Sequence, residues 1–344
     1  MNSYKALAKK IYYQLNPYQK GLVDRFRFKI GLLPRITHGV SDREWLPHPY
    51  RAAMVISADL ELGWAFRYAH RATPTSLTVR HVSDQTRRNI PSLIALFDRY
   101  EMPITWATVG HLFLDSCHLV DGKAHPNLPR PPYFENEWWT YQHGDWYDDD
   151  PCTSLADAPE WYASDLIRKI LAAKVKHEIA CHTFSHIDCS ESVCPSELLR
   201  AELTTCRQLA AEWGIDLKSF VFPANIGGNI AILKEQSFEA YRLDTVCHMG
   251  IPTIDDFGLC AIPGGIFWEV PNGWKLNEWE RVTKRFVDLA LDKNLVLHLW
   301  FHPSCEEANI NQTFPNLLEY VNTKRSEIWV VTMRDLANFI IRGN

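Results

Sequence analysis

The chain has 344 residues, of which 46% are hydrophobic and 22% are charged, and its formal net charge at pH 7 is −5. A chain of this length can bury an ample core as one large α/β domain or as two smaller ones. The slightly acidic balance gives no sign of the basic surface that binds nucleic acids, so we expect no nucleic-acid partner.

Cysteine usage and the first residues predict a cytoplasmic protein. The nine cysteines are odd in number and include no C-x-x-C pair, which is typical of reduced thiols rather than of a disulfide framework. The first ten residues, M-N-S-Y-K-A-L-A-K-K, lack the uninterrupted apolar core of a signal peptide. No window of the sequence reaches the apolar length of a transmembrane helix.

Residues 1–45 are predicted to form a basic helical extension. Residues 1–40 contain eight lysines and arginines and a single acid, Asp24. Apolar residues between Tyr4 and Leu15 follow helical spacing, with lysines largely between them. Such a helix could lie on an anionic membrane, at its inner face, or pack on the main domain with a solvated basic side. Packing is the favoured interpretation, and peripheral membrane contact through residues 1–40 is kept as the alternative.

Residues 46–344 are predicted to form one domain of alternating strands and helices. The expected strands are Ala52–Ala58, Ile104–Val109, Ile179–Cys181, Ser219–Phe222, Ala240–Leu243, Leu259–Ile262, Leu295–Trp300 and Ile328–Thr332. The expected helices include Asn89–Tyr100, Ser164–Lys174, Pro195–Trp213 and Glu278–Leu291. This alternation predicts parallel βα units that form a distorted (β/α) barrel of about seven strands. An open, doubly wound sheet is the alternative, but no G-x-G-x-x-G follows the first strand to suggest dinucleotide binding.

A long insertion at about residues 112–160 interrupts the alternation. It contains no convincing strand or long helix, and it is rich in aromatic residues such as Trp138, Trp139 and Trp146. Loops of this length in compact domains are usually functional or disordered, and aromatic residues argue against disorder. We interpret these tryptophans as a substrate-covering surface for the flat faces of sugar rings. The alternative is a lid that only packs on the barrel.

Two carboxylates follow the first long apolar run, in the sequence S-A-D-L-E-L-G-W. Positions i and i+2 of a strand face the same way, so Asp59 and Glu61 are expected to point together into the mouth of the barrel. Barrel enzymes keep their catalytic groups at the carboxyl ends of strands. One carboxylate can bind a metal while the other accepts a proton from water. The alternative is a solvated acidic pair at a strand end.

Two histidines, His182 and His186, follow another short apolar run. Imidazoles that converge from a strand end and from the next turn can take adjacent corners of a tetrahedral Zn²⁺ site. One alternative is a pair of hydrogen-bonded loop histidines. Another is a structural Cys₂His₂ zinc site that would include two of the cysteines Cys181, Cys189 and Cys194, although the spacing of these cysteines matches no zinc module known to us.

A further histidine pair lies in the sequence L-V-L-H-L-W-F-H-P-S. His302 ends the predicted strand, just before Pro303, where a general acid would be needed. His298 lies deeper in the strand and is interpreted as a hydrogen-bonded core residue.

Together these motifs resemble those of the polysaccharide deacetylases, carbohydrate esterase family 4. The sequence H-T-F-S-H at residues 182–186 is similar to the family's metal-binding H-[ST]-x-x-H, D-L-E at 59–61 to its acidic pair, and F-H-P at 301–303 to its last motif. The resemblance covers about residues 52–335. It implies that Glu61, His182 and His186 bind Zn²⁺ or a similar divalent ion, that Asp59 is the base and that His302 is the general acid.

Two departures from the family pattern concern the region around Asp59. The stretch Ser219–Asn225 lacks the arginine that steadies the catalytic aspartate in well-known members. Asn225, through a hydrogen bond, and Arg242, through its charge, are the candidates to replace it. Asn225 is also a candidate substrate-binding residue, because backbone N–H groups near it could hold an oxyanion. The second departure is Glu61, which stands where the commonest motif has aspartate.

The resemblance implies a metal-dependent hydrolase that removes an acetyl or formyl group from an amino sugar. The expected substrate is a polysaccharide or an intracellular glycan-assembly intermediate, linked to a lipid or a nucleotide. One alternative is an inactive carbohydrate-binding protein on the same scaffold. The other is a metal hydrolase of a small non-sugar amide, such as a ureide.

Overall fold

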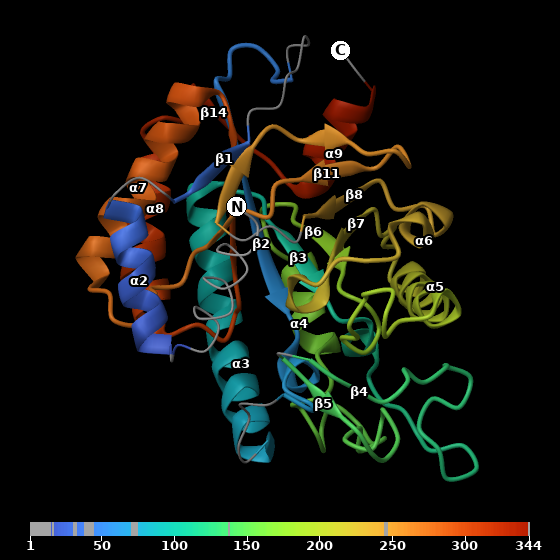
Figure 1. Cartoon of the computed structure of the whole chain (residues 1–344). Helices are drawn as coiled ribbons and strands as arrows, with labels where there is room; N and C mark the ends of the chain where they lie inside the picture. Colours follow the sequence, from blue (N-terminus) through green and yellow to red (C-terminus); the bar gives the residue numbers. More distant parts are fainter. Residues whose placement is uncertain are drawn as a thin grey trace.

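The computed structural model describes residues 15, 17–29, 33–37, 45–69, 75–136, 138–243 and 247–342. The helix predicted between residues 4 and 15 therefore lies outside the described residues, apart from its last position. A curled sheet forms the centre of the molecule, with helices packed around it (Figure 1). Within the described ranges, no helix combines the length and the apolar character needed to cross a membrane.

The described strands of the central sheet follow the order β1-β9-β13-β2-β3-β6-β7-β8-β11-β10, with β14 beside β2 and β12 beside β13. All eight predicted strands are present: β2 (Ala52–Leu60), β3 (Thr105–Thr108), β6 (Glu178–Cys181), β7 (Ser219–Val221), β8 (Ala240–Arg242), β11 (Cys260–Ile262), β13 (Val296–Phe301) and β14 (Ile328–Val330). They pair in parallel wherever they are neighbours, as βα units require. Strand β2 is buried on both faces, which explains its continuous apolar run. The prediction of a distorted (β/α) barrel is confirmed, and among the described strands β1 and β10 are the two ends of the sheet and do not pair with each other.

Helices cover the outside of the sheet (Figure 1). Their bounds are α3 (Thr75–Tyr100), α4 (Ser164–Leu171), α5 (Ser196–Glu212), α6 (Ile230–Glu235), α7 (Leu276–Lys293), α8 (Phe314–Asn322) and α9 (Met333–Arg342). The four predicted helices are all present. The largest difference is that α3 begins at Thr75 rather than Asn89. The polar residues before Pro91 hid this first half, because few of them face the core.

The parallel register brings the carboxyl ends of the central strands to one edge. Phe301 pairs with Ala58, and Thr108 pairs with Cys181. Cys181 in turn pairs with Phe220. The residues that follow these strands therefore meet at one edge of the sheet, where parallel α/β proteins place their sites.

The described part of the basic extension packs on the barrel. Helix α2 (Pro17–Lys29) lies against α7, where Arg25 pairs with Glu278 and the ring of Phe28 packs edge-on against Trp274. The indole Nε1 of Trp274 donates to the carbonyl oxygen of Gly21, 3.1 Å away. A Cβ at Gly21 would lie 1.8 Å from the carbonyl oxygen of Asn272, so only glycine allows this approach. Strand β1 (Arg35–Thr37) continues the contact by pairing in parallel with β9 (His248–Gly250).

The insertion contains little regular structure, as predicted. Its strands β4 (Phe134–Glu135) and β5 (Thr140–Tyr141) form a two-residue antiparallel ladder. Most of its aromatic side chains belong to the main hydrophobic core. The insertion thus extends the core beyond the carboxyl edge of the sheet, toward the lower part of Figure 1.

Candidate active site and metal centre

Glu61, His182 and His186 converge on one point at the carboxyl edge of the sheet. Glu61 directly follows β2, and His182 directly follows β6. The Oε1 atom of Glu61 lies 3.0 Å from Nε2 of His182 and 3.2 Å from Nε2 of His186. All three side chains are buried, at 9%, 0% and 3% exposure. The three predicted metal ligands therefore meet, and their ligand atoms lie within 4.8 Å of one another.

A backbone carbonyl holds the ring of His182 through Nδ1 and leaves Nε2 directed at Glu61. Its Nδ1 lies 2.7 Å from the carbonyl oxygen of Val221. A carbonyl can only accept, so Nδ1 donates to it, and Nε2 is the ring nitrogen that faces Glu61. This is the orientation that a neighbouring carbonyl imposes on metal-binding histidines. Thr183 and His186 both have positive φ, 58° and 56°, so the loop bends sharply enough to aim both rings at the same carboxylate.

The electrostatics of this group suit a divalent cation. Burial works against the charged form of Glu61, but His186 and hydrogen bonds from both histidines hold its pKa well below the usual range. Burial also lowers the pKa of His186, which keeps the imidazole neutral and able to bind a metal. Two imidazoles and one carboxylate are a common set of protein ligands at catalytic zinc sites, where a fourth position stays open. The residues present therefore fit the implied ion.

Asp59 is bound by an arginine from a neighbouring part of the sheet. Arg242, at the end of β8, donates from Nη1 and Nη2 to the two carboxylate oxygens of Asp59, at 2.9 and 2.7 Å. Burial opposes ionisation of Asp59, but Arg242 and His182 outweigh it and lower its pKa. The guanidinium of Arg242 also stacks on the ring of Trp300, 4.8 Å from its centroid. The charge that Ser219–Asn225 lacks is thus supplied by Arg242.

Asn225 and Ser57 complete the surroundings of this arginine. Arg242 donates to Oδ1 of Asn225 and to Oγ of Ser57, each at 3.0 Å. Ser57 in turn lies 2.9 Å from Nε2 of His298, whose Nδ1 faces the carbonyl of Pro263. His298 is therefore a hydrogen-bonded core residue, as predicted. Arg242 and Asn225, the two candidates to replace the missing arginine, therefore belong to one hydrogen-bond network around Asp59.

His302 lies at the same edge with a carboxylate partner that the sequence analysis missed. Its Nδ1 and its backbone N–H lie 3.1 and 2.9 Å from Oε1 of Glu269. Burial lowers the pKa of His302, but Glu269, Glu61 and Asp59 outweigh this effect and raise it to about 9. The ligand atoms of Asp59, Glu61 and His302 lie within 4.8 Å of one another. The signal for Glu269 was its position shortly after the apolar run that forms β12 (Ile266–Phe267) beside β13.

Glu202 of α5, also missed, supports the loop that carries the two histidines. Its carboxylate accepts hydrogen bonds from the backbone N–H groups of Phe184 and Ser185, at 2.7 and 2.8 Å, and from Oγ of Ser185 at 2.7 Å. Tyr147 of the insertion donates to it as well, at 3.1 Å. Burial raises the pKa of Glu202. Its place on the apolar face of α5 was the available signal, since an acid at such a position needs several hydrogen bonds.

The three tryptophans predicted to bind substrate differ in their exposure. Trp138 is 42% exposed, whereas Trp139 and Trp146 are buried. The ring of Trp139 packs against His186 at a centroid distance of 5.7 Å. The indole Nε1 of Trp146 donates to Oγ of Ser185, 2.9 Å away. Burial of Trp139 and Trp146 favours the alternative in which this part of the insertion packs on the site.

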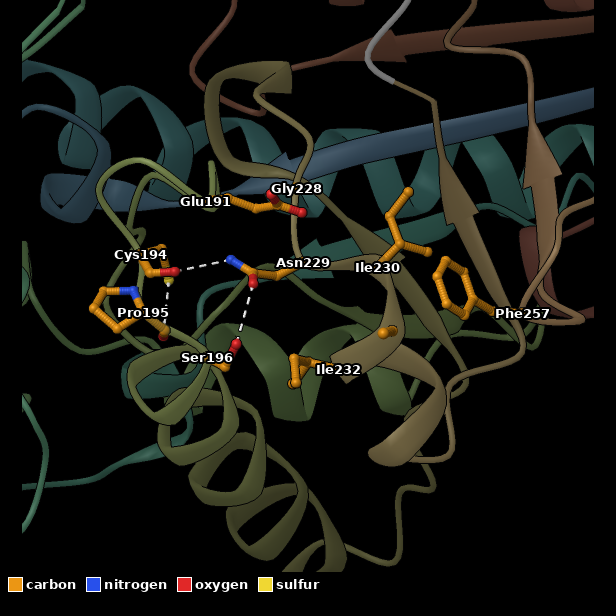
Figure 2. Close-up of a pocket in the computed structure, with 10 residues that line it drawn as sticks. Glu191, Cys194, Pro195, Ser196, Gly228, Asn229, Ile230, Ile232 and Phe257 are labelled. Carbon is orange, nitrogen blue, oxygen red and sulfur yellow. Dashed lines mark hydrogen bonds between the residues drawn. The ribbon is translucent and has the colours of Figure 1, made fainter.

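The candidate catalytic residues do not line the cavity in Figure 2. This cavity has a volume of about 510 Å³ and lies between the loops that follow β6 and β7. Asn229 shapes it by donating from Nδ2 to the carbonyl oxygens of Cys189 and Cys194, at 3.2 and 2.9 Å. Its lining residues are Glu191, Cys194, Pro195, Ser196, Gly228, Asn229, Ile230, Ala231, Ile232 and Phe257.

The structural Cys₂His₂ alternative does not fit the arrangement. Cys181, Cys189 and Cys194 are buried thiols. Among the described residues, the potential metal-binding group that contains His182 and His186 is completed by Glu61 and by no cysteine.

Comparisons with known proteins bear on the fold. No model of a protein family matches the sequence, and no curated protein matches it either. The structure is similar to that of a protein assigned as a polysaccharide deacetylase from Mycobacterium smegmatis, with a TM-score of 0.56 and 16% identity over 85% of this chain and 92% of that one. A protein from Pseudomonas aeruginosa PAO1 with the same assignment gives a TM-score of 0.55 and 14% identity over 85% and 93% of the two chains.

The chain has the polysaccharide deacetylase fold. The fold is not confined to proteins described as acting on sugars, because Puue allantoinase is similar to the same extent. Its TM-score is 0.57, with 13% identity over 87% of this chain and 93% of that one. The deacetylase fold therefore explains the arrangement of the strand ends, and the chemistry has to be argued from the side chains.

Proposed function

We propose that the protein is a metal-dependent hydrolase that removes an acetyl or formyl group from the nitrogen of an amino sugar. The observation that carries the proposal is the meeting of three distant strand ends. There, the Glu61, His182 and His186 group lies beside the Asp59–Arg242 pair and the His302–Glu269 pair. A divalent ion held by the group would supply Lewis acidity toward an acyl carbonyl and a water molecule.

The side chains divide the proton transfers of amide hydrolysis between them. Asp59, kept ionised and oriented by Arg242, accepts the proton of the attacking water. His302, held protonated by Glu269, donates a proton to the departing amine nitrogen as the C–N bond breaks. A carboxylate base and an imidazolium acid have pKa values set apart in the direction these two roles require. The products are a free amino sugar and acetate or formate.

Arg242 removes the main reason to consider an inactive binding protein. That alternative depended on the arginine missing from Ser219–Asn225, and the structure provides a two-point contact to Asp59 from β8 instead. Within the proposed substrate class, we favour a sugar linked to a phosphate-bearing lipid or nucleotide, because residues 1–40 are strongly basic. In the described part of that extension, however, Arg25 is already paired with Glu278.

A small cyclic or linear amide is the second candidate substrate. Two observations favour it. The structural similarity to Puue allantoinase equals that to the deacetylases. In addition, two of the three tryptophans expected to contact sugar rings are buried against protein.

Amine release, measured together with metal content, tests the proposal. Wild-type protein and the variants His182→Ala and Asp59→Asn are incubated with N-acetylglucosamine oligosaccharides and, separately, with allantoin. We expect amine and acetate from the oligosaccharides with wild-type protein only, and one metal ion fewer per chain in His182→Ala. Asp59→Asn should keep its metal. Hydrolysis of allantoin alone would select the second candidate, and unchanged metal content in His182→Ala would contradict the ligand assignment.

A further inference from the structure

A second group of potential metal ligands lies between the insertion and the loop that carries His182 and His186. His111 belongs to the short helix η2 (Gly110–Phe113) that follows β3, and Cys117, His125 and Asp150 belong to the insertion. The Oδ2 atom of Asp150 lies 2.7 Å from Nε2 of His125 and 3.0 Å from Nε2 of His111. The Sγ atom of Cys117 lies 3.6 Å from the same oxygen and 3.9 Å from Nε2 of His111. These four ligand atoms lie within 4.8 Å of one another.

We propose that His111, Cys117, His125 and Asp150 form a structural Zn²⁺ site that fastens the insertion to the barrel. Zinc bound tetrahedrally to nitrogen, oxygen and sulfur places neighbouring ligand atoms about 3.3–3.7 Å apart. Of the four distances, 2.7 and 3.0 Å lie below that range, 3.6 Å lies within it and 3.9 Å lies above it, so small side-chain movements would seat the ion. A thiolate with two imidazoles selects zinc over Mg²⁺ or Ca²⁺, which prefer oxygen ligands.

Neighbouring groups orient the proposed ligands as metal sites require. Nδ1 of His111 lies 3.2 Å from the carbonyl oxygen of Trp161, so it donates there and leaves Nε2 free for a metal. The phenol oxygen of Tyr162 lies 3.2 Å from the sulfur of Cys117 and is held by the backbone N–H of Thr153. Hydrogen-bonded outer groups of this kind fix the ring orientation and the basicity of ligands.

A guanidinium fixes the loop that carries His125. Arg130 donates to the carbonyl oxygens of Ala124, His125 and Leu128 at 2.6 to 2.8 Å. The ligand loop is therefore held in place by the protein without contribution from an ion, which lowers the ordering cost of binding one.

The charge of the group also calls for a cation. The side chain of Asp150 is fully buried, and its ion-pair partners among the described residues are His111 and His125. A buried carboxylate is costly unless a positive charge lies beside it. A divalent ion would supply that charge to Asp150 and would hold Cys117 as a thiolate. An ion can reach the group from solvent, because Cys117 and His125 line a cavity of about 830 Å³.

The position of the group assigns it a structural rather than a catalytic role. The ring of His111 packs against Trp64 and Phe184, at centroid distances of 4.4 and 5.4 Å. Its backbone N–H donates to the carbonyl oxygen of Phe184, 3.0 Å away. Four protein ligands leave no open position for a substrate, which is the mark of structural zinc sites. The ion would link the insertion to the loop that holds His182 and His186.

Cobalt absorption in a variant without the active-site ligand tests this assignment. Full-length His182→Ala protein is stripped of metal and titrated with Co²⁺, together with the same protein carrying Cys117→Ser or Cys152→Ser. A thiolate bound to Co²⁺ gives a charge-transfer band in the near ultraviolet, and the active-site group contains no thiol. We expect the band in His182→Ala, its loss with Cys117→Ser and its survival with Cys152→Ser. The matched control is Cys152, because it lies beside Cys117 in the same loop.

Zinc analysis supplies an independent readout in the wild-type background. We expect His125→Ala to contain one zinc ion fewer per chain than wild-type protein, and circular dichroism checks that each variant is folded. Absence of the cobalt band, its survival in the Cys117→Ser protein, or unchanged zinc in His125→Ala would overturn the proposal. So would a thiol count showing Cys117 and Cys152 joined as a disulfide.

Discussion

The two histidine-containing groups of this molecule differ in what surrounds their ligands. Around Glu61, His182 and His186, the next side chains are Asp59 and His302, each held in a defined charge state by its own partner. Around Asp150, the neighbouring groups are the hydroxyl of Tyr162 and the backbone N–H of Cys152, which orient the carboxylate. A group that keeps acid and base beside an open position can do chemistry, whereas a group closed by four protein ligands can only hold structure.

The supporting elements differ in the same sense. Glu61 and His182 directly follow strands of the central sheet, and their positions are set by the ladder between β2, β3 and β6. Three of the four ligands of the second group lie on the irregular insertion, and an ion there would join the insertion to η2 of the barrel. Substituting one carboxylate in each group should therefore separate activity from stability.

The largest expected effect comes from comparing Glu61→Gln with Asp150→Asn. Glu61→Gln removes a proposed ligand of the active-site ion, and kcat/KM should fall by roughly 10³-fold or more with little loss of thermal stability. Asp150→Asn should lower Tm by about 5 °C or more while activity falls less than about tenfold. Differential scanning calorimetry and the amine-release assay measure the two quantities. If both variants lost activity and stability alike, the two groups would not be functionally distinct.

A smaller effect is expected at Arg242. Its ion pair with Asp59 lies beside the first group, whereas in the described residues no arginine pairs with Asp150, the carboxylate of the second group. Arg242→Met leaves Asp59 buried without its partner, which should cost about 3–5 kcal/mol of unfolding free energy and about 10²-fold in kcat. Arg242→Lys keeps the charge but not the two-point contact, so its effects should be intermediate. The double variant Arg242→Met/Asp59→Asn should recover most of the lost stability, measured by urea unfolding, and none of the lost activity. Additive losses in that double variant would show that the pair is not coupled.

The sequence predicts the first group far better than the second for a physical reason. Parallel strands bring their carboxyl ends to one edge, so finding the apolar runs before Asp59, His182 and His302 is enough to expect their side chains to meet. The ligands on the insertion follow no such periodic element. Cys117, His125 and Asp150 are irregularly spaced, and they meet because a loop held by Arg130 folds back on η2.

The residues that support the site were hidden for related reasons. Arg242 could be named only as a candidate, since the pairing of β8 with β7 had to be known before its reach toward Asp59 was clear. Glu269 depends on β12 joining the sheet beside β13, and a two-residue strand leaves almost no pattern in a sequence. Trp139 and Trp146 were predicted to contact substrate because the sequence does not show that other protein groups cover their rings.

The smallest expected effect is a shift in pH dependence caused by Glu269. His302 acts as an acid only while protonated, and its partners raise its pKa to about 9, so activity should fall as the pH rises through that region. In Glu269→Gln the raising contact is lost, and the alkaline limb of the kcat/KM profile should move to lower pH by roughly one unit, with little change near pH 6. The matched control is Glu306→Gln, which removes an exposed negative charge close to His302 in sequence and should leave the limb in place. An unmoved limb in Glu269→Gln, or equal shifts in both variants, would mean that His302 is not the acid. The chemical distinction between the two groups would then depend on Asp59 and Arg242 alone.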